Sequence, residues 1–504
     1  MTMKQHNSTR NSKWWISILG VCLAGSPVWA EKPEHQKMSQ GDLATSLTIF
    51  NLWAEQPRER QEVLRSAYAF LSADRQRTIA ALAADPGFQN ACRAAALTHL
   101  GGPMLGCISA TGATVWVRTL APAQVTVETD VDGRTLTFGP VASTVDSDLG
   151  ALVPVSGLPS GSTIPYRVRI DGKLAEIPAR AAIRTLPAGN ANVRIAFGSC
   201  QHRWGLGNPQ LSDRIRERNP AALLLIGDVA VQDRRGHLGL HRTDFLMRDL
   251  TPPWQQLSAT VPVYVGWDDH DYFDNDLAGL PKGFTDADRT GVRKVFTQSW
   301  NNPAYGSGGS GGRGTFLSTR IGPCDVIMTD NRSFREGRLG SFLGDAQMAW
   351  LKQQLAACKG PFILLSCGTM WSDMVSGGKD SWGKCDPAGR EEIFRWIEEK
   401  RIAGVLLLSG DRHGARGFTL PRENGFKFYE FGGASLGGRI GPPAKSHAWT
   451  TQLYGIAGDY AFSEFEFDTA KDDPEVTLRL MGEKGDVIHA MTLKRSELTP
   501  PKRP

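Results

Sequence analysis

The chain has 504 residues, of which 41% are hydrophobic and 22% are charged, with 55 glycines, 29 prolines and 8 cysteines. These proportions are those of a folded protein and exclude a disordered chain, a coiled coil or a fibre, and the length suggests about three domains. The net charge of +5 over 504 residues is too small to indicate specific nucleic-acid binding. After residue 30 no apolar run reaches the roughly 20 residues of a membrane-spanning helix, which excludes a multi-span membrane protein.

The first 30 residues have the pattern of a secretory signal peptide. A basic start precedes an apolar run from Trp14 to Ala24, and Val28-Trp29-Ala30 resembles a cleavage site. A membrane anchor is the alternative, but the apolar run is short for one. A lipid anchor on Cys22 is a further alternative. We therefore expect residues 1–30 to be removed and the mature protein to be secreted or periplasmic.

Export makes the cysteines after residue 30 candidates for disulfide bonds, because extracytoplasmic compartments are oxidising. The pairs that lie close along the chain are Cys92 with Cys107, Cys324 with Cys358, and Cys367 with Cys385. This pairing leaves Cys200 as an unpaired thiol.

Residues 31–103 are predicted to be helical. Val63, Leu64, Ala67 and Leu71 lie at helical spacing, and a second apolar stripe begins at Ile79. This segment offers packing residues and no group of catalytic side chains.

Residues 104–187 change to a period of two. Val115 and Val117, then Val125 and Val127, alternate with polar neighbours, and glycine and proline turns separate the runs. Short strands at this spacing indicate a small β-sandwich. We expect it to position or shield the domain that follows.

Residues 188–504 are predicted to form a layered α/β domain. Short apolar runs without alternation indicate strands buried on both faces. The predicted strands are Val193–Phe197, Ala222–Ile226, Val261–Val265, Val326–Thr329, Phe362–Leu365 and Val405–Leu408, with helices at Asp345–Leu355 and Glu391–Ile397.

Residue types that ligate metals follow four of these strands. They are Cys200 after the first, Asp228 after the second, Asp269 and His270 after the third, and Asp411 and His413 after the last. Each alone is more often a turn residue, a buried thiol or a structural histidine. However, the carboxyl ends of neighbouring strands converge on one crevice, and carboxylates gathered there repel unless a cation compensates them. The repetition predicts a dinuclear metal site.

The chain also resembles the PhoD-like alkaline phosphatases and phospholipases D, a secreted branch of the calcineurin-type metallophosphoesterases, over roughly residues 190–470. The matching motifs are Phe197-Gly198-Ser199-Cys200-Gln201, Trp267-Asp268-Asp269-His270, Asp330-Asn331-Arg332-Ser333-Phe334-Arg335 and Leu408-Ser409-Gly410-Asp411-Arg412-His413. The resemblance implies an α/β/β/α metallophosphoesterase sandwich over residues 188–504. It also implies that the β-sandwich at 104–187 is fibronectin-like.

The resemblance assigns a role to each residue at the strand ends. The implied ligands are Cys200 and His413 at the first metal, Asp269 and Asp411 at the second, and Asp228 between both, with His270 as the catalytic imidazole.

The ligand types indicate two unequal metals. A thiolate and an imidazole suit iron or zinc, whereas carboxylates suit calcium, magnesium or manganese. Val231 departs from the family, which often has a tyrosine ligand to ferric iron at that position. A zinc or ferrous ion, or a ligand from Gln232-Asp233, could compensate for the missing phenolate.

The expected function is that of a secreted, metal-dependent phosphoester hydrolase using metal-bound hydroxide, with a small-molecule or lipid phosphoester as substrate. His270 would protonate the leaving oxygen, and Arg332 and Arg335 would bind the phosphate, Arg332 as part of the catalytic machinery. A structural ion pair with Asp330 is the alternative role of these arginines.

Three other functions remain open. The first is a phosphodiesterase or phospholipase D, and the second is a catalytically inactive secreted binding protein. The third is a hydrolase with Ser199 as nucleophile, although Gly198-Ser199-Cys200 lacks the G-x-S-x-G elbow.

Overall fold

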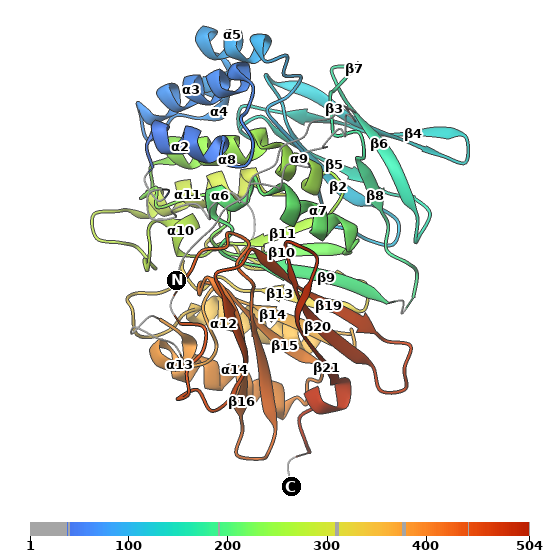
Figure 1. The fold of residues 1–504 in the computed structure, drawn as a ribbon, viewed down its shortest axis with the longest axis vertical. Coiled ribbons are helices and arrows are strands. Elements are labelled where there is room, and N and C mark those ends of the chain that lie inside the picture. Colours follow the sequence, from blue (N-terminus) through green and yellow to red (C-terminus); the bar gives the residue numbers. More distant parts are fainter. Residues whose placement is uncertain are drawn as a thin grey trace, which may run out of the picture. The chain divides into compact units, whose positions relative to one another are not determined.

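The computed structural model describes residues 38, 41–189, 192–307, 312–374, 380–441 and 443–502 (Figure 1). All of them belong to one unit of the chain, Gln36–Pro504. The predicted signal peptide, residues 1–30, lies outside these ranges. None of the helices within them combines the length and the apolar character that crossing a bilayer requires.

Helices form the first part of the described chain, as predicted. Val63, Leu64, Ala67 and Leu71 have no exposed surface. They pack in one apolar cluster with residues of helix α8, over which Figure 1 shows the N-terminal helices lying. The helices concerned are α2 (Leu43–Phe50), α3 (Arg58–Ser72), α4 (Ile79–Ala83), α5 (Pro86–Ala94) and α8 (Leu238–Leu250).

Two small sheets follow, from residue 101 to residue 184. Val115, Val117, Val125 and Val127 are all buried, which confirms the predicted period of two. They share one apolar cluster, so the two sheets face each other across it. A fibronectin-like character of this unit stays a prediction. The strand orders are β1-β2-β5 and β4-β3-β6-β7, with β8 paired to β6. The bounds are β1 (Gly101–Gly106), β2 (Ala113–Arg118), β3 (Ala123–Val131), β4 (Arg134–Ser143), β5 (Gly150–Val155), β6 (Thr163–Ile170), β7 (Lys173–Leu174) and β8 (Ala182–Arg184).

Two larger sheets form the rest of the chain, with strand orders β11-β10-β9-β19-β20-β21 and β12-β13-β14-β15-β17-β16-β18. The six predicted strands are present as β9, β10, β11, β13, β14 and β15, although β11 begins at Val263 rather than Val261. The first sheet has β9 (Val193–Gly198), β10 (Ala222–Ile226), β11 (Val263–Gly266), β19 (Ala461–Asp468), β20 (Glu475–Gly482) and β21 (Val487–Lys494). The second has β12 (Leu317–Ile321), β13 (Cys324–Met328), β14 (Phe362–Ser366), β15 (Val405–Ser409), β16 (Gly414–Pro421), β17 (Lys427–Gly432) and β18 (Gln452–Ala457).

Successive residues of one strand contact different layers, which explains why these strands lack alternation. Leu224 and Leu364 lie in the cluster that both sheets share. Leu223 packs in a cluster with α7, α8, α9 and α11, and Leu365 packs in a cluster with α12, α13 and α14. The predicted α/β/β/α layering is thus confirmed (Figure 1). The remaining helices are α6 (His202–Gly205), α7 (Pro209–Glu217), α9 (Pro252–Ser258), α10 (Asp269–Tyr272), α11 (Asp286–Ser299), α12 (Gly344–Ala357), α13 (Trp382–Cys385), α14 (Pro387–Glu399) and the 3-10 helix η1 (Arg495–Leu498).

The three predicted disulfide pairings are wrong. Each of the seven cysteines within the described ranges is a free thiol. Cys367, for example, donates from Sγ to the carbonyl oxygen of Thr369 at 2.7 Å and accepts from Trp382 Nε1 at 3.2 Å. Closeness along the chain was therefore a poor guide to disulfide pairing.

Candidate metal centre

The carboxyl ends of β9, β10, β11 and β15 bring the six predicted site residues together. Asp228, Asp269 and His270 form one group of potential ligands, and Asp228, Asp269 and Asp411 meet in a second group that also contains Asp268. Cys200 and His413 meet in a third. Within each group the ligand atoms lie within 4.8 Å of one another.

The carboxylate group consists of Asp228, Asp268, Asp269 and Asp411. All four are buried, and burial raises the pKa of Asp228, Asp268 and Asp411. Asp228 Oδ1 and Asp268 Oδ2 are buried without a hydrogen-bond partner among the described residues. Buried carboxylate oxygens of this kind are costly unless a cation or a donor satisfies them. The group therefore fits a cation that prefers oxygen ligands.

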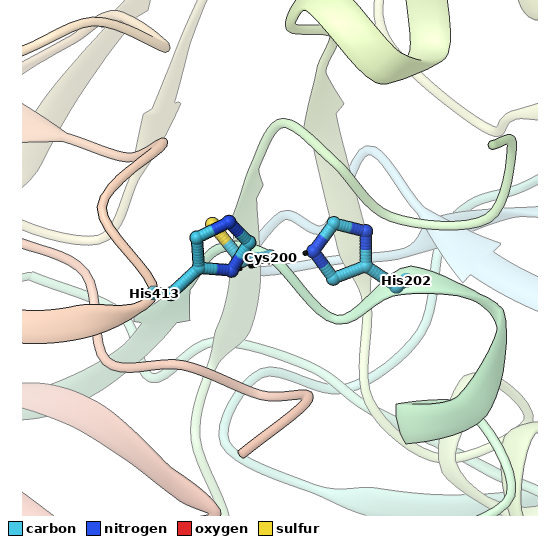
Figure 2. Close-up of side chains that lie close together, drawn as sticks. All are labelled: Cys200, His202 and His413. Carbon is cyan, nitrogen blue, oxygen red and sulfur yellow. Dashed lines mark hydrogen bonds between the residues drawn. The ribbon is translucent and has the colours of Figure 1, made fainter. Parts of the chain in front are cut away.

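The thiolate–imidazole group consists of Cys200, His202 and His413 (Figure 2). The two rings face each other, with His202 Nε2 and His413 Nδ1 3.5 Å apart and the Cys200 side chain beside them. Burial lowers the pKa of both histidines well below its ordinary value. Neutral imidazoles and a thiolate are the ligand forms for zinc or iron, so this group fits such a metal.

His202 was missed by the sequence reasoning. It follows Cys200 by two positions and begins the short helix α6, four positions after the end of β9. Its ring is fully buried and stacks on Trp204 at a centroid distance of 4.5 Å. The Cys-x-His spacing was the only signal that could have marked it as a ligand.

Asp228 lies where the groups meet. Its Oδ2 is 3.6 Å from Cys200 Sγ, and its carboxylate belongs to both groups that contain Asp269. A residue in this position can contribute one oxygen to each of two neighbouring cations. The bridging role of Asp228 stays a prediction.

The backbone of the ligands is strained. Cys200, His202, Asp228, Asp411 and His413 all have positive φ angles, between 50° and 68°. Such angles are uncommon outside glycine and persist only where surrounding structure enforces them, often at functional sites. One enforcing contact is visible at Asp271, whose carboxylate accepts from the backbone nitrogens of Asp228 at 2.6 Å and Val229 at 3.1 Å.

His270 is held by a carboxylate that is not in any metal group. Its Nδ1 lies 2.6 Å from Asp233 Oδ1. Burial opposes the charged ring, but Asp228, Asp269 and Asp233 outweigh it and raise the pKa of His270 well above its ordinary value. Gln232 contacts both rings, with Oε1 3.0 Å from His202 Nδ1 and Nε2 3.1 Å from His270 Nδ1.

These contacts describe the surroundings of Val231, the position at which the family often has a tyrosine ligand. Val231 is fully buried in the apolar cluster beside α8. Gln232 and Asp233, considered above as replacement ligands, instead bond to the two histidines. Within the described part of the chain, His202 is the additional candidate ligand that lies with Cys200 and His413.

The two arginines predicted to bind phosphate are already paired. Arg332 is fully buried, bonds to Asp268, and lies 3.3 Å from Asp380 and 3.8 Å from Asp269. Arg335 Nη1 lies 2.6 Å from the same Asp380. The alternative prediction, an ion pair between these arginines and Asp330, is wrong, because their side chains pair with other carboxylates. Asp330 instead accepts from the backbone nitrogen of Arg332 at 2.9 Å.

The segments that flank helix α2 contact helix α6, which begins at His202, and the loop that carries Asp233. Trp53 Nε1 donates to the carbonyl oxygen of Trp204 at 2.7 Å, and Arg234 Nη1 donates to that of Gly41 at 2.7 Å. This gives the helical segment a positioning role, for which its sequence offered no sign.

Comparisons with known proteins identify the family and the fold. A family model described as PhoD-like phosphatase matches residues 195–468, and a domain of unknown function (DUF7800) matches residues 96–186. No match was found among curated proteins. The solved structure titled "Structure of PhoD" is similar over 80% of this chain and 92% of its own, with a TM-score of 0.64 at 16% identity, which shows a shared fold. A weaker likeness, with a TM-score of 0.38 at 14% identity, covers 60% of this chain and 89% of GAP50, the anchor in the inner membrane complex of Plasmodium.

The matched family region contains every strand end that carries a candidate ligand, from Cys200 to His413. The chain belongs to the PhoD-like phosphatase family.

Proposed function

We propose that this protein is a metal-dependent phosphoester hydrolase with two metal sites. The observation that carries the proposal is the position of Asp228 between a thiolate–imidazole group and a buried carboxylate group. The unpartnered oxygens of Asp228 and Asp268 support the presence of cations.

The two sites would take different metals. Cys200, His202 and His413, with one oxygen of Asp228, would hold zinc or iron. The carboxylates would hold calcium, magnesium or manganese. When bound, two such cations would act as Lewis acids toward phosphoryl oxygens and make water nucleophilic near neutral pH.

The residues of this chain would supply orientation and a proton. Because Asp233 occupies Nδ1 of His270, Nε2 is the nitrogen left to protonate the leaving oxygen. Arg332 would hold Asp268 and Asp269 in place rather than bind substrate directly. Arg335 would act through Asp380 in the same way.

The test is to measure metal content and turnover on the same preparation. Hydrolysis of nitrophenyl phosphate or its bis-ester by protein with about two metals per chain supports the proposal, and loss of that activity on chelation supports it further. Faster hydrolysis of the bis-ester than of nitrophenyl phosphate would identify the phosphodiesterase or phospholipase alternative. Stoichiometric metal with no turnover of either ester would favour the inactive binding protein and overturn the proposal.

Ser199→Ala separates this proposal from serine catalysis. Ser199 is buried, and its Oγ lies 3.4 Å from Cys200 Sγ. Activity of this variant near the wild-type level, with loss on chelation, would exclude Ser199 as the nucleophile.

We also propose that the protein is exported. The support is the basic start and the apolar run Trp14–Ala24. N-terminal sequencing of the protein recovered outside the cytoplasm should begin near Glu31. A protein that retains Met1 there would contradict cleavage.

A further inference from the structure

The arginines around the carboxylate group are neutralised by carboxylates. Arg332 and Arg335 share Asp380, and Arg412 Nη2 bonds to Asp411. None of these guanidinium groups is free to receive the charge of a phosphoryl group without losing an existing partner. A phosphate dianion needs such a donor beyond the metals.

Arg439 is different. It has no hydrogen bond or ion pair with the residues that the structure describes, and its side chain is half-buried rather than extended into solvent. It lies in the loop that follows β17, between two glycines that pack against the thiolate–imidazole group. A Cβ on Gly437 would lie 2.5 Å from the carbonyl oxygen of Cys200, and one on Gly441 would lie 2.6 Å from His413 Cβ.

This close packing places a cation beside a metal site. Arg439 is two positions from each of these glycines, so its side chain is within reach of the group formed by Cys200, His202 and His413. A guanidinium and a metal cation that lie near each other repel unless an anion lies between them. The substrate of a phosphoester hydrolase supplies that anion.

We propose that Arg439 binds the phosphoryl group of the substrate and gives the site a preference for dianionic phosphomonoesters over monoanionic phosphodiesters. The inference rests on the proposed function and deepens it. A monoester carries a second negative charge above a pKa of about 6, and a diester does not. The unpaired, positively charged guanidinium can bind this second negative charge.

The experiment compares wild type with Arg439→Gln, Arg439→Lys and the control Arg134→Gln, each as full-length metal-loaded protein. Arg134 is an exposed arginine on β4. The substrates are nitrophenyl phosphate and bis(nitrophenyl) phosphate, and inorganic phosphate serves as inhibitor. Metal content is measured for every variant.

For Arg439→Gln we expect kcat/KM on the monoester to fall about 100-fold, as for loss of a charged transition-state donor, and on the diester by less than about fivefold. The inhibition constant of phosphate should rise at least about tenfold. Metal content should not change, Arg439→Lys should recover part of the monoester activity, and Arg134→Gln should match wild type. Equal losses on both esters, no loss on either, or loss of metal would overturn the inference.

Failure of the proposed function has a different signature. Wild type with stoichiometric metal would then hydrolyse neither ester. Calorimetric titration with inorganic phosphate still tests Arg439 in that case. Weaker binding by Arg439→Gln than by wild type supports the assignment, and equal binding overturns it.

Discussion

His270 and Asp233 are joined by a contact of 2.6 Å between Nδ1 and Oδ1, and Asp233 lies outside all of the candidate metal groups. The carboxylate also accepts from the backbone nitrogen of Asn275 at 2.9 Å and from Gln232 Nε2 at 3.0 Å, which fixes its orientation. It therefore sets the ring orientation of His270 and the nitrogen that carries the transferable proton.

Replacing Asp233 should slow the proton transfer without removing the metals. We expect Asp233→Asn to lower kcat about 10- to 100-fold, because the charged ring loses its carboxylate partner and its orientation. The alkaline limb of the kcat profile should move to lower pH, since a carboxylate that raises the pKa of His270 is gone. The measurement is a pH–rate profile with elemental analysis.

Asp274→Asn is the matched control. Asp274 lies in the same region and pairs with the exposed Arg235 rather than with His270. It should leave the profile unchanged. An Asp233→Asn variant with wild-type kcat and an unmoved alkaline limb would show that Asp233 does not act on His270.

Asp228→Asn should change stability in opposite directions with and without metal. In chelated protein, the substitution removes a carboxylate whose burial and whose neighbours Asp268, Asp269 and Asp271 outweigh its attraction to His270. The variant should therefore be about 1–3 kcal/mol more stable than chelated wild type. With metal added, wild type should gain stability and the variant should gain much less.

Unfolding of both proteins in chelator and in added zinc or calcium measures this reversal. The variant should also lose at least one metal and nearly all activity. If it were stabilised by metal as strongly as wild type, Asp228 would not join the two groups.

Removing His202 should weaken the softer metal site and leave the carboxylate site intact. Its Nε2 is 3.5 Å from His413 Nδ1, in the group that also contains Cys200. A lost ligand should cost at least the roughly 10- to 100-fold in affinity that is typical for outer residues of a metal site. We expect His202→Ala to lose zinc or iron in chelator competition.

Cobalt substitution gives a readout that is independent of activity. The wild-type protein should show thiolate-to-cobalt absorption from Cys200, and His202→Ala should show it weakened or absent. Calcium or magnesium binding should be unchanged. Zinc affinity equal to that of wild type would remove His202 from the ligand set.

The strand ends were predictable, whereas the contacts that complete the site were not. Asp228 and His413 come shortly after the buried strands β10 and β15, and the packing of the two sheets on each other brings the ends of these strands together. His202 follows the end of β9 by four positions, as His413 follows the end of β15, but it begins the short helix α6, and its approach to His413 depends on the conformation of the turn at Cys200. Arg332 meets Asp380, 48 positions away, in a segment without regular pattern. The support that Trp53 gives to Trp204 spans 151 positions. Periodicity and strand ends predict layers and edges, but they do not determine side-chain pairing across such separations.

Buried His241 should make the protein less stable in mild acid, independently of the metal site. It lies on α8, is almost fully buried, and its Nε2 has no hydrogen-bond partner among the described residues. Burial lowers its pKa to about 3, although Asp244 opposes the shift. The folded protein therefore holds this ring neutral where the unfolded chain, with a pKa of about 6.5, would be protonated.

The sign of the effect follows from proton uptake on unfolding. Above pH 6.5 both states are neutral and His241 has no effect. As the pH falls from about 6.5 toward 3, only the unfolded state binds the proton, so stability is lost progressively, by about 2 kcal/mol at pH 5. His241→Gln cannot titrate, so its loss of stability between pH 7.5 and pH 5 should be smaller than that of wild type by about this amount.

Urea unfolding of both proteins at the two pH values, in chelator so that metal loss does not contribute, measures the difference. The buried rings of His202 and His413 titrate equally in both proteins, and their effect cancels in the comparison. Equal pH dependence of wild type and His241→Gln would mean that the ring of His241 accepts its proton without unfolding, and that α8 can open to water at this position.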